Sequence, residues 1–172
     1  HKNLIGYFGS LHPGRGIELI LNIAKLSNKY TYVIFGGDSK SISNIKDKNH
    51  IPKNIIFMGY VSPSQSKYYM TLMDVLLMPY QEKVSIGVKN VDTSKWMSPL
   101  KMFEYMSSGV PIISSNLEPL KEILIHRVNS LLTDYDDPLK WFKNIETLIN
   151  DKKINLMISQ NAFSDLNNKY TW

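Results

Sequence analysis

Short apolar segments alternate with longer amphipathic segments along the chain, and turn residues separate them. The apolar segments have the length and composition of strands that are buried on both faces of a parallel sheet. They predict strands at 4–8, 31–35, 55–58, 74–78, 111–115 and 130–133. Strands that alternate with helices favour parallel pairing, right-handed crossovers and helices on both faces of the sheet.

The segments between the strands carry the signals of helices. Ile17, Ile20 and Ala24 recur at helical spacing, and Ser62-Pro63 places a capping serine before a proline at the first helical position. The predicted helices cover 16–26, a polar stretch ending at 50, 62–73, a segment from 98 to a stop at 109, 119–125, and two terminal segments beginning near 137 and 153. A long polar segment without a clear period, 80–97, is predicted to be a loop. The fold class is therefore α/β, a Rossmann-like three-layer α/β/α domain with a parallel sheet, and 1–172 is expected to be a single domain.

The helix that begins at Ser98 gives the strongest indication of function. Serine is a good N-cap, Pro99 suits the first helical position, and Leu100 and Phe103 are predicted to share the packed face. The amino end of such a helix attracts anions, and phosphate is the usual occupant in nucleotide-binding α/β folds. Lys101 lies in this first turn, where the helix dipole disfavours a cation, and a bound anion would explain its charge.

A second candidate anion site follows the first predicted strand. The segment from Gly9 to Gly16 is a glycine-rich turn between a strand and a helix, and Arg15 can present two parallel N–H groups to phosphate oxygens. An ordinary tight turn with an exposed arginine explains this segment equally well. Because ligands of parallel sheets bind beyond the carboxyl ends of the strands, both candidate sites are expected at one edge of the sheet.

Three other residues have a structural alternative beside a functional one. Glu104 lies one turn beyond Lys101, and the two could form an intrahelical pair that contributes about 0.2–0.5 kcal/mol. Tyr60 follows the third strand and could pack in the core. Asp38 follows a glycine pair, and capping of the next helix is favoured over contact with a ligand.

Composition and charge limit the classes of protein to which this chain can belong. The chain is 43% hydrophobic and 20% charged, as is usual for a soluble globular domain, and it contains no cysteine for a disulfide or a thiolate site. No apolar run is long enough to cross a membrane. No signal peptide or lipidation motif opens the chain, so a cytoplasmic location is expected, with the inner face of the membrane as an alternative.

The net charge of +5 favours anionic partners in general. The lysines between 25 and 53 lack the interleaved aromatic residues of a single-strand binder, so they indicate a solvated surface, and no nucleic-acid partner is expected. Lysines near Trp141 and Phe142 could make peripheral contact with an anionic membrane, although packing of these aromatic rings in the core is favoured.

No metal site is expected. The Asp134-Tyr135-Asp136 segment has the form of an Asp-x-Asp metal motif, but it runs into Asp137-Pro138, which indicates the start of a helix. His12, His50 and His126 are dispersed and have no carboxylate at metal-ligand spacing, and only His12, near the glycine turn, is close to a candidate site.

In their order and spacing these segments resemble the C-terminal domain of the retaining, nucleotide-sugar-dependent glycosyltransferases of group 1 (family 4), which have the GT-B fold. The likeness runs nearly from end to end. It rests on the helix at 98–106 with Gly-Val-Pro and a strand behind it, and on segments at 9–16, 34–38, 56–61, 74–79 and 170–172.

The resemblance implies the roles of individual residues. Glu104 matches the glutamate that holds the ribose hydroxyls, and Tyr60 and Val61 stand where the family places the nucleobase. Arg15 aligns with one of two cations that neutralise the donor diphosphate; Ser10 replaces the other, and Lys101 is expected to supply that charge. Trp96 occupies the position of a second glutamate, so no carboxylate that contacts the sugar is carried over. The remaining residues expected to bind the donor nucleotide are Gly9, Gly14, Gly16, Gly36, Ser98, Pro99 and Leu100.

The function implied is transfer of a sugar from a nucleoside diphosphate sugar to a glycan, lipid-linked or protein acceptor, with retention of the anomeric configuration. Arg15 and Lys101 are the residues expected to stabilise the leaving diphosphate, and no cofactor or metal is required. An N-terminal acceptor domain of the same protein would complete the active site, so the domain alone is expected to bind without transferring. Two alternatives are a UDP-sugar 2-epimerase of the same fold and a nonenzymatic Rossmann-like or flavodoxin-like binding module.

Overall fold

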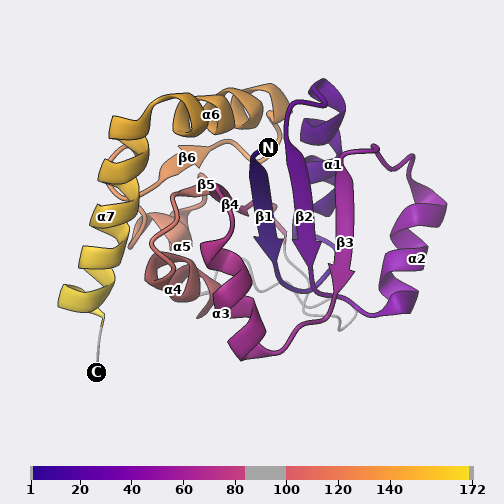
Figure 1. Ribbon diagram of the computed structural model, residues 1–172, viewed down its shortest axis with the longest axis horizontal. Helices are drawn as coiled ribbons and strands as arrows, with labels where there is room; N and C mark the ends of the chain where they lie inside the picture. Colours follow the sequence, from indigo (N-terminus) through magenta and orange to yellow (C-terminus); the bar gives the residue numbers. More distant parts are fainter. Residues whose placement is uncertain (1, 84–99, 171–172) are drawn as a thin grey trace.

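A computed structural model describes residues 2–83 and 100–170 of the protein. Within these ranges the strands form one parallel sheet in the order β3-β2-β1-β4-β5-β6 (Figure 1). The strands are β1 Leu4–Phe8, β2 Thr31–Phe35, β3 Ile55–Gly59, β4 Val75–Met78, β5 Ile112–Ser115 and β6 Leu131–Thr133. The strands that the hydrophobic pattern predicts are all present, with bounds that differ by at most one residue.

Helices cover both faces of this sheet. They are α1 Ile17–Leu26, α2 Ser39–Lys48, α3 Pro63–Thr71, α4 Leu100–Ser107, α5 Glu118–Lys121, α6 Pro138–Asn150 and α7 Lys152–Lys169. One buried cluster joins the sheet to α1 and α6, and a second joins its other face to α3, α4 and α5. In Figure 1, α6 runs across the top of the sheet and α7 descends at its left. The prediction of a Rossmann-like α/β/α domain is confirmed.

Side-chain caps begin several helices where the sequence places them. The Asp38 carboxylate accepts a hydrogen bond from the Ser41 amide at 2.8 Å, which confirms its capping role. Ser62 and Gln65 form a reciprocal capping box at the start of α3. Asp137 accepts from the Lys140 amide at 2.9 Å. Each cap satisfies backbone N–H groups that the first helical turn leaves without intrahelical partners.

Two details of the helix prediction are wrong. The helix predicted at 119–125 ends at Lys121, because the side chain of Asn129 takes over the next backbone groups: it accepts from the Ile125 amide at 2.7 Å and donates to the Ile123 carbonyl at 3.0 Å. The packed face of α4 does not include Leu100, which is 78% exposed.

The packed face of α4 instead consists of Met102, Tyr105 and Met106, with Phe103 half-buried against the same cluster. The hydroxyl of Tyr105 accepts a hydrogen bond from the Phe8 amide at 2.9 Å and donates one to the Leu77 carbonyl at 3.2 Å. Helix α4 is therefore fixed to the carboxyl ends of β1 and β4. Residues 84–97 of the loop predicted at 80–97, and the start of this helix at Ser98-Pro99, lie outside the described residues.

The aromatic residues of α6 belong to the core. Trp141 is completely buried, and its indole N–H donates to the Asp134 carbonyl at 2.9 Å. The ring of Phe142 packs 5.9 Å from that of Tyr30. The favoured prediction, that these two rings pack in the core, is thus confirmed, with Trp141 fully and Phe142 partly buried. In the part of the chain that the structure describes, no helix has the length and apolar character needed to cross a membrane.

Candidate nucleotide site at the carboxyl edge of the sheet

The strand order places a crevice beside β1. The chain moves outward from β1 to β2 and β3, then returns to β4 on the other side of β1, so the connections leave in opposite directions at the boundary between β1 and β4. Ligands of open α/β sheets bind at such a switch point, outside the carboxyl ends of the strands. The arrowheads of β1, β2 and β3 mark this edge at the bottom of Figure 1.

Glycines form the floor of the crevice. Gly9, Gly36 and Gly59 stand at the ends of three adjacent strands; the Gly9 amide donates to the Phe35 carbonyl at 2.9 Å, and the Gly36 amide donates to the Gly59 carbonyl at 2.6 Å. Gly36 has φ +117°, and a Cβ atom there would overlap the carbonyl of Gly9. The absence of side chains leaves the backbone open to a ligand.

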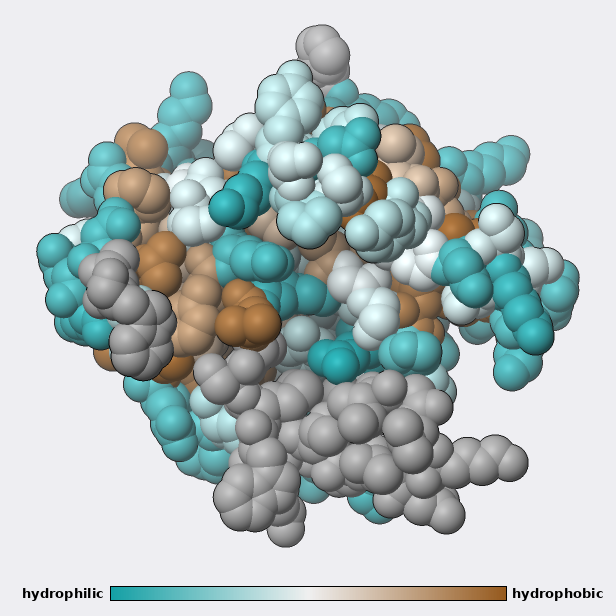
Figure 2. Space-filling model, turned by 90° about the horizontal axis from the view of Figure 1, so that it is seen from below, coloured by the Kyte–Doolittle hydropathy of each residue, from teal (hydrophilic) through white to brown (hydrophobic). Residues whose placement is uncertain are grey.

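A cavity of about 340 Å³ opens above this floor, within the range of about 300–1,000 Å³ that is usual for small-molecule sites. Figure 2 looks onto this edge and shows hydrophilic and hydrophobic side chains next to one another across it. The lining residues are Phe8, Gly9, Ser10, Phe35, Gly36, Gly37, Tyr60, Val61, Ser66, Lys101 and Glu104.

One wall of the cavity is aromatic. The rings of Phe8 and Phe35, which line the cavity, stack with centroids 4.3 Å apart, and Tyr69, which does not line it, stacks with Phe35 at 5.1 Å. Tyr60 is 78% exposed, so its interpretation as a core residue is wrong. Together with Val61, these side chains offer an apolar surface on which a planar ring can stack.

Two cations lie near the same ring, that of Tyr80, and one of them, Lys101, lines the cavity. The Nζ atom of Lys101 lies 4.5 Å from the ring centroid of Tyr7, and the Cζ atom of Arg15 lies 5.2 Å from that of Tyr80. The pKa of Lys101 is lowered to about 7, first because its ammonium group is buried and second because Arg15 repels it, while Glu104 opposes the fall. A bound anion would relieve this repulsion and favour the charged lysine.

Glu104 stands on the rim of the cavity and is exposed. It lies one turn beyond Lys101 on α4, yet these two described residues form no ion pair, so the intrahelical pair considered from the sequence is not present. Its carboxylate is therefore available to accept hydrogen bonds from a ligand.

The predicted site residues divide into four groups. Those that line the cavity are Gly9, Ser10, Gly36, Tyr60, Val61, Lys101 and Glu104. Arg15 does not line it but lies over the ring of Tyr80, while Gly14 and Gly16 build the turn: the Gly14 carbonyl accepts from the Gln81 amide at 2.9 Å, and Gly16 caps α1 with φ +83°. Leu100 points to solvent. Ser98, Pro99 and Trp96 lie outside the described residues.

Sequence reasoning missed several residues of the site. Phe8 and Phe35 are the last residues of predicted strands, and that position is the signal that could have identified them. Gly37 and Ser66 also line the cavity. No pattern distinguishes Ser66 from the other serines at the start of α3, so only the structure reveals its position.

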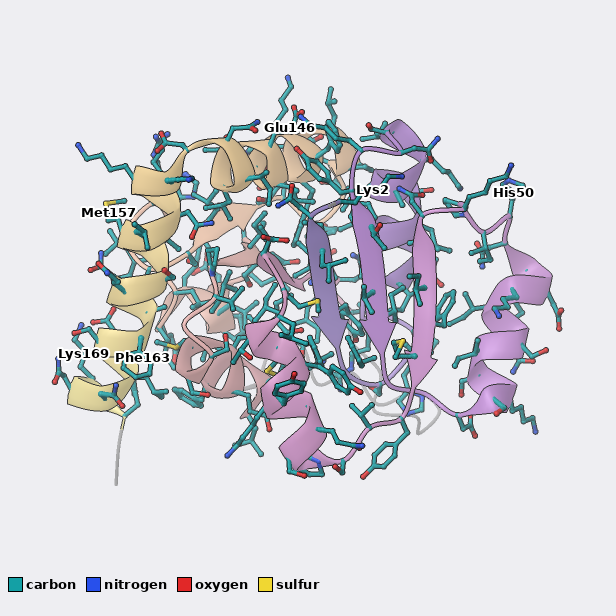
Figure 3. All side chains as sticks on the ribbon, in the orientation of Figure 1. Lys2, His50, Glu146, Met157, Phe163 and Lys169 are labelled. Carbon is teal, nitrogen blue, oxygen red and sulfur yellow. The ribbon has the colours of Figure 1, made fainter. Side chains whose placement is uncertain are left out.

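The other candidate polar residues have structural roles. Asp134 pairs with Lys140 at 3.0 Å, and Asp137 caps α6. The Nδ1 atom of His126 accepts from the Leu132 amide at 3.0 Å, and burial lowers the pKa of this imidazole. His50 lies at the far end of α2 from the cavity (Figure 3). Across residues 2–83 and 100–170, no group of three histidine or acidic side chains could hold a metal ion.

Comparison with known proteins agrees with the geometry. Residues 2–151 match the family model described as glycosyl transferases group 1. The chain belongs to this family. It is 25% identical over 115 residues to the putative teichuronic acid biosynthesis glycosyltransferase TuaH of Bacillus subtilis, a match that covers 66% of this chain and 27% of TuaH.

Two solved structures extend the likeness to the fold, which is one half of a GT-B glycosyltransferase. HepE of Anabaena in complex with UDP-glucose superposes with a TM-score of 0.75 at 18% identity, over 95% of this chain and 43% of HepE. The C-terminal domain of the group 1 glycosyltransferase LpcC from Francisella tularensis superposes with a TM-score of 0.75 at 20% identity, over 98% of this chain and 86% of that domain. The chain thus spans less than half the length of TuaH and HepE.

Proposed function

We propose that this chain is the donor-nucleotide domain of a retaining glycosyltransferase and binds a nucleoside diphosphate sugar in the cavity at the carboxyl edge. The observation that carries the proposal is the arrangement around the glycine floor: an aromatic wall, two cations that lie near the ring of Tyr80, and an exposed carboxylate on the rim. These three features match the base, the diphosphate and the ribose of one ligand.

In this arrangement the nucleobase packs against Tyr60 and Val61. The ribose hydroxyls donate hydrogen bonds to the Glu104 carboxylate. The diphosphate lies over Gly9 and meets Lys101 and Arg15, whose charges it neutralises. The complex of HepE with UDP-glucose, a protein of the same fold, supports a ligand of this class.

Sugar transfer would follow from this placement. As the bond between the sugar and the diphosphate breaks, negative charge develops on the leaving oxygen, and Arg15 and Lys101 stabilise that charge without a nucleophile from this chain. An N-terminal domain would bring the glycan, lipid-linked or protein acceptor to the same face as the leaving group, which gives retention of configuration. This chain by itself would bind the donor and not transfer the sugar.

Titration calorimetry with UDP, GDP and ADP in the presence of a chelator tests the proposal. We expect saturable binding of at least one of the three without a divalent metal, because the two cations can neutralise the diphosphate. Binding of none of them, or binding that requires magnesium or manganese, would contradict it. Binding of a flavin in preference to all three would favour a nonenzymatic module.

A further inference from the structure

Two buried tyrosine rings lie beneath the cations of the site. Tyr7 is the penultimate residue of β1 and Tyr80 follows β4, and each is only 1% exposed. The Lys101 Nζ atom is 4.5 Å from the Tyr7 centroid and 5.8 Å from the Tyr80 centroid, and the Arg15 Cζ atom is 5.2 Å from the Tyr80 centroid. Tyr80 therefore lies within reach of both cations, at the boundary between β1 and β4.

The rings of Tyr7 and Tyr80 offset an electrostatic repulsion between the two cations. Lys101 and Arg15 repel each other, and Lys101 forms no ion pair with any carboxylate in the part of the chain described here. The face of an aromatic ring carries negative potential and attracts a cation within about 6 Å of its centroid. A carboxylate in the same place would hold the cations more strongly, but it would also repel an incoming phosphate. A ring attracts the cations and carries no net charge to oppose the anion.

A hydrogen bond holds the ring of Tyr7 in place. The Tyr7 hydroxyl donates to the Ser10 carbonyl at 2.8 Å, which ties the ring to the glycine turn. Burial raises the pKa of both tyrosine hydroxyls, so the rings stay neutral across the physiological range. Gly9 completes the enclosure, because a Cβ atom at this position would overlap the Lys101 ammonium group.

We propose that Tyr80, assisted by Tyr7, is a positioning residue that holds Arg15 and Lys101 together as an anion-binding pair while the site is empty. The inference rests on the proposed function only in taking the anion to be the diphosphate of a nucleotide. The ring of Tyr80 then has a role in addition to filling space in the core.

A series of residues at position 80 with constant shape tests the role of the ring. Tyrosine is replaced by phenylalanine and then by phenylalanines with increasing numbers of ring fluorines, which weaken the negative potential of the ring face without removing the ring. Affinities for UDP, uridine and inorganic pyrophosphate are measured by calorimetry. Tyr80→Phe removes the hydroxyl that interacts with Arg15, and it serves as the reference for the fluorinated residues. UDP and pyrophosphate affinity should then fall stepwise with fluorination, about five- to tenfold in total, while uridine affinity stays constant.

Tyr32→Leu provides a control, because Tyr32 is also fully buried but, unlike Tyr80, its ring is not in contact with Arg15 or Lys101. It should lose stability and keep its UDP affinity. Affinities that do not change along the fluorine series, or that fall equally for uridine, would overturn the inference. Pyrophosphate binding that weakens along the fluorine series, with no nucleotide bound by the wild-type chain, would contradict the proposed function and leave the cation pair intact. A chain that binds neither would overturn both.

Discussion

Single residues of the cavity have distinct parts in the proposed complex, and the clearest contrast is between Arg15 and Glu104. Arg15 is assigned to the diphosphate, whereas Glu104, on the rim, is assigned to the ribose. Arg15 is expected to bind phosphate and Glu104 to bind sugar hydroxyls. Substitution of each residue should therefore change the affinities for the nucleoside, the monophosphate and the diphosphate in a different pattern.

Arg15→Ala should weaken binding of UDP by roughly ten- to a hundredfold, since a charge-assisted hydrogen bond contributes about 1.5–3 kcal/mol. The loss should be smaller for the monophosphate and nearly absent for uridine. Glu104→Gln serves as the matched variant, and it should weaken all three ligands to a similar extent. Calorimetry on the three ligands measures both patterns. An equal loss across the series for Arg15→Ala would show that the arginine shapes the pocket and does not bind phosphate.

Lys101 should make donor binding depend on pH. Its pKa in the free protein is about 7, and a bound diphosphate raises that pKa because it stabilises the ammonium form. Above pH 7 the free lysine is mostly neutral, so binding takes up a proton and affinity falls as pH rises, by at most about tenfold per unit. Below pH 7 this lysine contributes no further pH dependence.

UDP-glucose is the suitable probe, because its diphosphate has no proton to lose in this range. Calorimetry at pH 8 in buffers of different ionisation enthalpy should detect the uptake of a proton, and Lys101→Met should abolish it. A wild-type affinity that is constant from pH 7 to 9 would show that the lysine stays charged in the free protein or makes no contact with the ligand.

At the scale of the elements, the sequence predicts the strands better than it predicts the helices. A buried strand such as β2 is marked by its own residues, whereas the end of a helix can depend on groups outside the helix. The end of α5 is decided by Asn129, which is completely buried and also donates to Asp165 of α7 at 2.8 Å. Nothing local to 119–125 signals this competition.

Asn129→Ala should therefore destabilise the fold without affecting the site. The substitution leaves the Ile123 carbonyl and the Ile125 amide without their partner, and each unsatisfied group costs about 1–3 kcal/mol where it is shielded from water. Urea denaturation should show a lower free energy of unfolding, and UDP affinity of the folded protein should stay unchanged. A loss below about 0.5 kcal/mol would mean that water replaces the side chain.

The sequence predicts only part of the candidate site, again because contacts between separate segments leave no local signal in the chain. Glycines at strand ends and a lysine in the first turn of a helix can be read from the chain, and Gly9, Gly36 and Lys101 do line one cavity. The tyrosines could not be found in this way. Tyr7 and Tyr80 are indistinguishable from core residues in the hydrophobic pattern, and only the pairing of β1 with β4 brings both rings next to Lys101.

At the scale of the whole molecule, the sheet separates two edges with different roles. The carboxyl edge holds the cavity, whereas the labelled side chains of Lys2 and Glu146 lie at the opposite edge (Figure 3). There Glu146 pairs with Lys29 at 3.2 Å on the surface, and such an exposed pair contributes little to stability. A ligand that enters at the switch point should therefore affect one edge of the molecule and not the other.

Backbone amide chemical shifts recorded by NMR during a titration with UDP test the position of the nucleotide site. We expect saturable shifts at the amides of Gly9, Gly36, Tyr60 and Glu104, with a common dissociation constant, and little change at Lys2 and Glu146. Saturable shifts confined to the amino edge, or the absence of any saturable shift, would contradict the placement of a nucleotide site in this cavity.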